Sequence, residues 1–157
     1  MPQQFSPGDI FGIPLPDGTM GTGQVLSLEP DALNSVGCVF LAATVGAKGL
    51  SGTPTPIAAL LVTPDLLTSG SWPVKSKAPV LLEREDRPYE CYRPLHWVGA
   101  KVTGSGIVQE FLAAYHGLMP WDDWHDPEYF ESLLLPGVNR PKGVVLAPMF
   151  PSRRTSS

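Results

Sequence analysis

Potential metal ligands lie close together in the second half of the chain. His116, Asp122, Asp123, His125 and Asp126 fall within one short stretch. Catalytic zinc sites on helices use a His-x-x-x-His pair, and structural zinc sites commonly use cysteine, but this stretch contains neither. The aspartates are instead typical of helix and turn caps. The sequence therefore predicts neither a metal ion nor another cofactor.

Potential nucleophiles have no partners at the spacing that catalysis needs. Gly104-Ser105-Gly106 is not the Gly-x-Ser-x-Gly turn of hydrolases, and Ser105 is predicted to cap a helix. Cys91 and His96 offer a thiol and a base. If they lie on one strand, however, their odd separation puts them on opposite faces. The sequence predicts no catalytic residues, so we interpret the protein as a binding protein rather than an enzyme.

Acidic and aromatic residues are concentrated between Val102 and Asn139. This stretch contains six of the fifteen acidic residues and no lysine or arginine, whereas the rest of the chain has nine acids and eleven bases. Aromatic anchors surrounded by carboxylates are typical of surfaces that dock a basic partner. The predicted partner-binding residues are Trp121, Asp122, Asp123, Trp124, Asp126, Glu128 and Glu131. The alternative is that the rings fill the core and the acids solvate a helix face.

The overall composition predicts one acidic domain without a membrane or nucleic-acid partner. The 157 residues fit a single domain, and the net charge of −4 repels a phosphate backbone. The longest aliphatic run, Ile57–Val62, is far shorter than the roughly 18 residues of a membrane helix. The first residues lack a signal-peptide pattern, so we expect a cytoplasmic protein. Cys38 and Cys91 are predicted to be two buried thiols rather than a disulfide.

The first two thirds of the chain have the alternation and turn residues of short strands. Strands are predicted at residues 9–15, 22–28, 37–43 and 57–62, with further short strands at 72–77, 80–82 and 89–95. The charged run 83–87 is predicted to be a solvated hairpin tip. Between the fourth strand and the next, Thr63 should cap one helical turn that begins at Pro64.

Helical spacing replaces this alternation after Ser105. A first helix is predicted from Ser105 to a left-handed Gly117, and a second from an Asp126 cap to Pro136. Residues 144–147 should form a last strand, and 151–157 a flexible tail after an ordered core of about residues 6–150. The predicted fold is α+β. It consists of a small curled antiparallel sheet or SH3-like barrel, with two short helices from the second half packed on it.

Two parts of the chain resemble the immunity protein 26 family of bacterial polymorphic-toxin systems. The first is GDIFGIPL at residues 8–15, followed by Asp17-Gly18 and by GQVL at 23–26. The second is FLAAYHGLMPW at 111–121, followed by Tyr129-Phe130 and by LLLP at 133–136. Residues 46–100 carry no marker of the family. The resemblance implies a mainly β protein, and the helices predicted after Ser105 depart from that description.

The resemblance also implies a function. Members of the family bind a cognate toxin domain in the cytoplasm and neutralise it, so we expect this chain to inhibit such a domain by occlusion. Two alternatives remain open at this point, namely a small hydrolase-like enzyme with a site built from loops and a general barrel-type interaction module.

Overall fold

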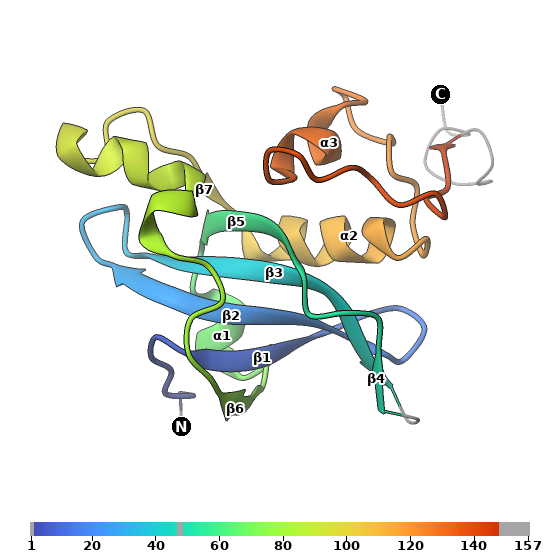
Figure 1. Cartoon of the computed structure of the whole chain (residues 1–157), viewed down its shortest axis with the longest axis horizontal. Helices are drawn as coiled ribbons and strands as arrows, with labels where there is room; N and C mark the ends of the chain where they lie inside the picture. Colours follow the sequence, from blue (N-terminus) through green and yellow to red (C-terminus); the bar gives the residue numbers. More distant parts are fainter. Residues whose placement is uncertain (1, 47–48, 148–157) are drawn as a thin grey trace.

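The computed structural model describes residues 2–46 and 49–147, which form an α+β fold (Figure 1). The predicted class is therefore confirmed. The elements, in chain order, are β1 (Asp9–Pro14), β2 (Met20–Glu29), β3 (Ser35–Gly46), β4 (Gly49–Ser51), β5 (Pro56–Val62), α1 (Asp65–Ser69), β6 (Val74–Lys77), the 3-10 helices η1 (Arg84–Asp86) and η2 (Pro88–Leu95), β7 (Val102–Thr103), α2 (Ser105–Tyr115) and α3 (Tyr129–Leu133).

The strands form one open sheet. Six of them follow the order β6-β1-β2-β3-β5-β7, and β4 pairs with β3 outside that order. All pairs are antiparallel except β5 with β7, which is parallel. The predicted SH3-like barrel is wrong, because the end strands β6 and β7 lie at opposite edges of the sheet. β7 is only two residues long, so it offers little edge for closing a barrel.

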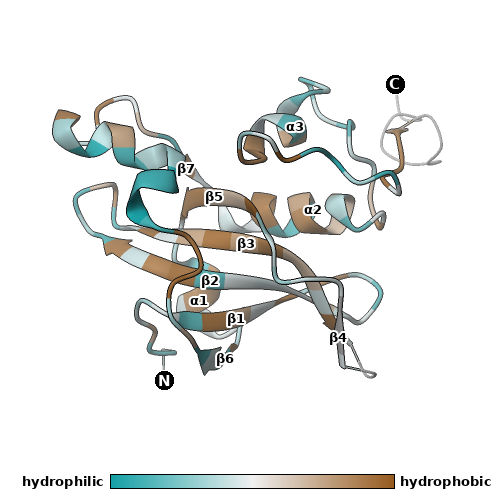
Figure 2. Cartoon of the chain, viewed as in Figure 1, coloured by the Kyte–Doolittle hydropathy of each residue, from teal (hydrophilic) through white to brown (hydrophobic). Residues whose placement is uncertain are grey.

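Both faces of the sheet are covered, which explains why its central strands are so apolar. Cys38 and Phe40 of β3 belong to the main core, which also contains residues of α1 and α2. Their neighbours Val39 and Leu41 pack on the other face, against the segment around Val80. Successive side chains of a strand point to opposite faces, so a strand covered on both sides reads as a continuous hydrophobic run. Figure 2 shows hydrophobic residues concentrated in the middle of the sheet and along α2.

The segment after β6 differs most from the prediction. Residues 80–82 are not a strand, the supposed hairpin tip at 83–87 contains η1, and the supposed strand 89–95 lies in η2. Pro88 begins η2 and Pro94 lies inside it. Tyr89 of η2 packs directly on the sheet, where a Cβ added at Gly37 would lie 3.0 Å from Tyr89 Cζ. A side chain at position 37 would therefore push η2 away from the sheet.

The long helix occurs where its apolar spacing predicts it, but its cap differs. Gly117 has a φ of +79°, as expected for a left-handed residue that ends a helix. Ser105 is the first residue of α2 rather than its cap. Its N–H donates to Thr63 Oγ1 (2.9 Å), and its hydroxyl donates to Asp65 Oδ1 (2.7 Å). Thr63 therefore accepts a hydrogen bond from the first N–H of α2 and does not cap α1. The two bonds of Ser105 connect α2 to the start of α1.

Other predictions at the level of elements have mixed outcomes. The strand predicted at residues 72–77 is present as the shorter β6, whereas residues 144–147 contain only an isolated bridge from Val145 to Pro120. α3 begins at Tyr129, three residues after the predicted cap. Both cysteines are free as predicted, but only Cys38 is buried and Cys91 is exposed. The predicted flexible tail, 151–157, lies outside the described residues.

The Gln24 side chain holds the segment after β6 against the sheet. Its amide is fully buried, donates to the carbonyls of Gly8, Ala78 and Pro79, and accepts from Leu81 N–H. Replacing Gln24 by leucine removes every one of these bonds, so we expect the free energy of unfolding to fall by about 2 kcal/mol. Urea denaturation measures this loss. The same substitution at exposed Gln4 should cost less than about 0.5 kcal/mol, and equal losses at the two positions would contradict this role of Gln24.

Candidate functional site

A groove of about 810 Å³ lies between η2 and α3, over the edge of β5. Figure 1 shows both helices on the β5 side of the sheet. The lining side chains come from four parts of the chain: Ala59, Leu60 and Leu61 of β5, Pro88, Tyr89 and Tyr92 of η2, residues 101–104 with Ile107 around β7 and α2, and Asp126, Tyr129, Ser132 and Leu133 beside or within α3. Its wall and floor side chains are mostly aromatic and aliphatic. Proteins commonly bind partners or ligands in such concave, mixed surfaces.

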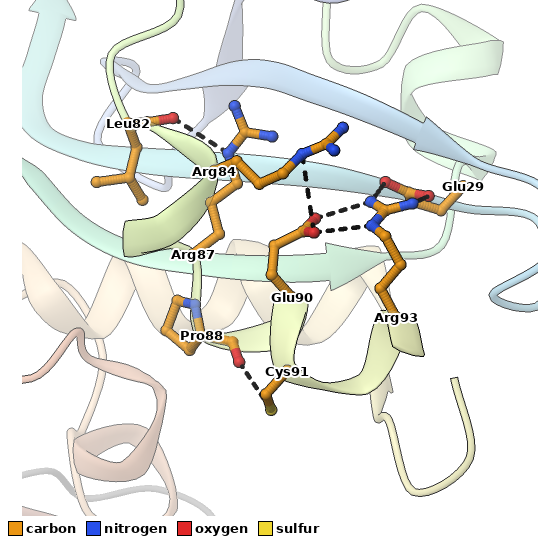
Figure 3. Close-up of polar contacts among 8 residues, drawn as sticks. All are labelled: Glu29, Leu82, Arg84, Arg87, Pro88, Glu90, Cys91 and Arg93. Carbon is orange, nitrogen blue, oxygen red and sulfur yellow. Dashed lines mark hydrogen bonds and ion pairs between the residues drawn. The ribbon is translucent and has the colours of Figure 1, made fainter. Parts of the chain in front are cut away.

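The η2 wall of the groove is fixed by an ion-pair network (Figure 3). The Arg93 guanidinium donates to both carboxylate oxygens of Glu29 (3.1 and 2.6 Å) and to both of Glu90 (2.7 Å each). Glu29 ends β2, so Arg93 joins η2 to the sheet. Arg84 lies 3.8 Å from Glu90, and Arg87 donates to the Leu82 carbonyl (3.1 Å).

Burial makes this network more important than an ordinary surface ion pair. The Glu29 and Glu90 side chains are only 6% and 12% exposed, and the Arg93 side chain is 34% exposed. The Arg93 guanidinium also lies 4.6 Å from the centre of the Trp97 ring. Because a carboxylate loses its hydration on burial, Glu29 and Glu90 depend on Arg93 for compensation. The network therefore positions Tyr89 and Tyr92, the two rings that η2 contributes to the groove.

Acid should weaken this network. Hydrogen bonds from Arg93 hold the pKa of Glu90 below its ordinary value. A carboxyl group with a lowered pKa in the folded state stabilises the fold above its unfolded pKa and loses that effect as the pH falls through the folded value. We therefore expect the free energy of unfolding to fall on acidification below about pH 4.3. In Glu90→Gln the fall between about pH 6 and pH 3 should be shallower; equal pH profiles would show that Glu90 contributes nothing to acid sensitivity.

Two of the predicted partner-binding residues serve the interior of the protein. Trp121 is 1% exposed and packs against Phe111 and Phe130. Its indole N–H donates to Glu131 Oε1 (3.3 Å). Asp122 Oδ1 accepts a hydrogen bond from Ala147 N–H (2.6 Å), which ties down the last described residues. For Trp121, the alternative that its ring fills the core is the one the structure supports.

Two further residues of the predicted set are partly buried. Trp124 packs against Tyr129 and Phe130, with ring centroids 5.1 and 5.5 Å apart. The Trp124 side chain therefore packs against α3 and remains partly exposed. Asp123 is half-buried beside it. Neither residue lines the groove.

The remaining three acids are exposed. Asp126, Glu128 and Glu131 lie at the start of α3 and within it, and Asp126 also lines the groove. Asp126 Oδ1 accepts a hydrogen bond from Glu128 N–H (2.9 Å). This bond forms a turn before α3, whereas the sequence predicted that Asp126 would cap a longer helix. This acidic rim, which we define as Asp126, Glu128 and Glu131, is the part of the predicted set that a partner can reach directly.

Sequence reasoning did not find the residues opposite the acidic rim. Tyr92 and Lys101 line the groove from η2 and from the segment before β7, and neither lies in a motif that carries the family resemblance. Their position across the groove from α3 depends on the path of the chain through two 3-10 helices. No periodicity in the sequence predicted these helices. Residues 88–95, with a proline at position 88, a second at position 94 and acid–base spacing between Glu90 and Arg93, gave the available hint of a short helix.

Other candidate chemistry finds little support in the described parts of the chain. Within residues 2–46 and 49–147, no three His, Cys, Asp or Glu side chains lie together in a way that could hold a metal ion. Cys91 lies in η2 and His96 directly follows it, so the two residues do not lie on one strand. The Cys91 thiol is directed to the Pro88 carbonyl (3.3 Å). No helix in the described segments is long and apolar enough to cross a membrane.

Comparisons with known proteins do not assign this chain to a family. No family model, no curated protein and no solved structure matches it. The resemblance to the immunity protein 26 family therefore stays a prediction, and the candidate site depends on the geometry of the groove and of the acidic rim.

Proposed function

We propose that the protein is an immunity protein that binds a basic toxin domain with the groove and the acidic rim and neutralises it by occlusion. The observation that carries the proposal is that the acidic rim, of which Asp126 lines a groove of about 810 Å³, lies in a stretch of the chain that has six acids and no lysine or arginine. The motifs at residues 8–26 and 111–136 add the resemblance to a family of toxin inhibitors.

The physical basis of the proposal is the division of work between charge and apolar surface. Exposed carboxylates of one sign accelerate the encounter with a basic partner and orient it. Desolvated rings and aliphatic groups then supply most of the affinity. The groove offers Tyr129 near Asp126 and Tyr92 on the η2 wall. The partner would act in the cytoplasm, where the producing cell needs protection.

Co-expression tests this function. Immunity genes lie next to the genes of their toxins, so the test protein is the C-terminal domain encoded by the adjacent gene. We expect that domain to stop growth when it is expressed alone, and expect growth to be restored when the intact chain is expressed with it. The two proteins should also co-purify. A toxic domain that the chain neither binds nor neutralises would refute the proposal, as would neighbouring genes that encode no toxic domain.

A further inference from the structure

Within the part of the chain that the structure describes, the outer edge of β5 is only partly paired. Near its end, Thr63 N–H donates to the Thr103 carbonyl of β7 (3.0 Å), and β7 pairs with Leu61 and Val62 only. At its start, the Ile57 carbonyl accepts from Leu135 N–H (2.8 Å). Ala59 lies between these two points. This edge of the sheet is therefore paired on either side of Ala59.

The backbone of Ala59 faces the groove. Successive residues of a strand direct their N–H and C=O groups alternately to the two neighbouring strands. The ladder between β5 and β3 is regular from Ala58 to Val62, so Ala59 faces the same side as Leu61 and Thr63, away from β3. Ala59 is 4% exposed and lines the groove, so an occupant can reach its backbone only from within the groove.

The groove has the surroundings that strand pairing needs. η2 lies on one side of the β5 edge and α3 on the other. Leu60 and Leu61 of β5 also line the groove. An extended chain that adds to a sheet edge gains main-chain hydrogen bonds, and side-chain pockets along the edge provide specificity. Here Tyr92 and Tyr129 supply rings, and their faces attract cationic side chains.

From this we infer that the groove binds an extended, basic segment of the partner, which pairs with β5 at Ala59 while its cationic side chains meet Asp126 and the tyrosines. The inference rests on the proposed function, because it describes the part of the toxin domain that enters the site. Among the described residues that line the groove, Lys101 is the one cation, and it opposes such a segment. Removing Lys101 should therefore strengthen binding, whereas removing the Asp126 charge should weaken it.

Amide hydrogen exchange tests the geometry in the free protein and with a probe. The probe is an acetylated, amidated heptapeptide of alternating arginine and valine. In the free protein the Ala59 amide should exchange at least about tenfold faster than the Leu60 amide, which faces β3. Saturating peptide should slow exchange at Ala59 and leave the β1 amides unchanged. Exchange at Ala59 that the peptide does not alter would overturn the inference.

Peptide affinities test the chemistry. Replacing arginine by glutamate in the peptide should abolish binding at about 1 mM, and N-methylation of alternate backbone amides should weaken binding at least about tenfold. Asp126→Asn should weaken binding of the arginine peptide about threefold and Lys101→Ala should strengthen it about twofold. An arginine peptide that does not bind at about 1 mM, equal binding of the N-methylated form, or no effect of either substitution would overturn the inference.

Filling the groove separates this inference from the proposed function. Ser132 is exposed and lines the groove, so Ser132→Tyr places a ring in the path of an extended segment without changing the core. The matched control is Ser76→Tyr on exposed β6. We expect Ser132→Tyr alone to lose both peptide binding and toxin neutralisation. If Ser132→Tyr still neutralises the toxin domain, the extended-segment inference is wrong and so is the part of the proposal that places the partner in the groove, whereas toxin neutralisation itself stands.

Discussion

Replacing Arg93 by methionine should lower the free energy of unfolding by about 3 kcal/mol, the lower end of the range for breaking a buried ion pair. Arg93 is the shared partner of Glu29 and Glu90, and the Glu29 side chain is only 6% exposed. Without the guanidinium, the Glu29 carboxylate stays buried without its compensating charge. The lower end of the range applies because a third of the Arg93 side chain is open to water, which screens the charge that remains.

Arg84 provides the matched control. Its side chain is 67% exposed and lies 3.8 Å from the same Glu90, so Arg84→Met removes the same charge from the same network. That change should cost less than about 1 kcal/mol, as exposed ion pairs usually do. Guanidinium chloride screens charge, so urea denaturation at low salt is the suitable measurement. Similar losses for Arg93→Met and Arg84→Met would show that the network does not anchor η2.

Removing the charges of the acidic rim should slow association with the toxin domain at least about tenfold at low salt. The triple variant Asp126→Asn, Glu128→Gln, Glu131→Gln keeps the shapes of the side chains. It also keeps the acceptors for Glu128 N–H and for the Trp121 indole, so the fold should not change. Because the long-range attraction is lost, the association rate of the variant should depend less on ionic strength than that of the wild type.

The η1 region offers a control with the same change in net charge. Glu83, Glu85 and Asp86 are exposed and lie outside the groove. Their replacement by glutamine and asparagine also removes three negative charges, so any effect of net charge alone appears equally in both triple variants. Stopped-flow measurements at several salt concentrations compare the two. Association that slows equally in both variants would mean that the partner senses the overall charge and not the acidic rim.

The sequence predicted the strands of the first half well because their patterns are local. Residues 9–15, 22–28 and 37–43 alternate or form apolar runs between turn residues, and each corresponds to a strand of the structure. The same local signals predicted β5 and α2. The SH3-like barrel, one of the two predicted forms of the sheet, was wrong because closure depends on the path after β6, and Pro88 and Pro94 place η2 there rather than another strand.

The candidate site could be predicted only in part for a related reason. The acids of the segment 102–139 are visible in the sequence, but Trp121 and Trp124 have no spacing that separates a core ring from a surface ring. The contacts of Trp121 with Phe111 and Phe130 decide that it is a core ring. The groove is formed by β5, η2 and α3. These elements lie far apart along the chain, so no local sequence pattern predicts that they meet.

The most direct test of the account is a hydrogen-exchange map of the complex with the adjacent gene's toxin domain. We expect protection on binding to be concentrated at Ala59, in the η2 segment through residue 104, and at 126–133. Protection confined to other surfaces, such as β6 and the β1–β2 turn, with the groove and the acidic rim unchanged, would contradict it.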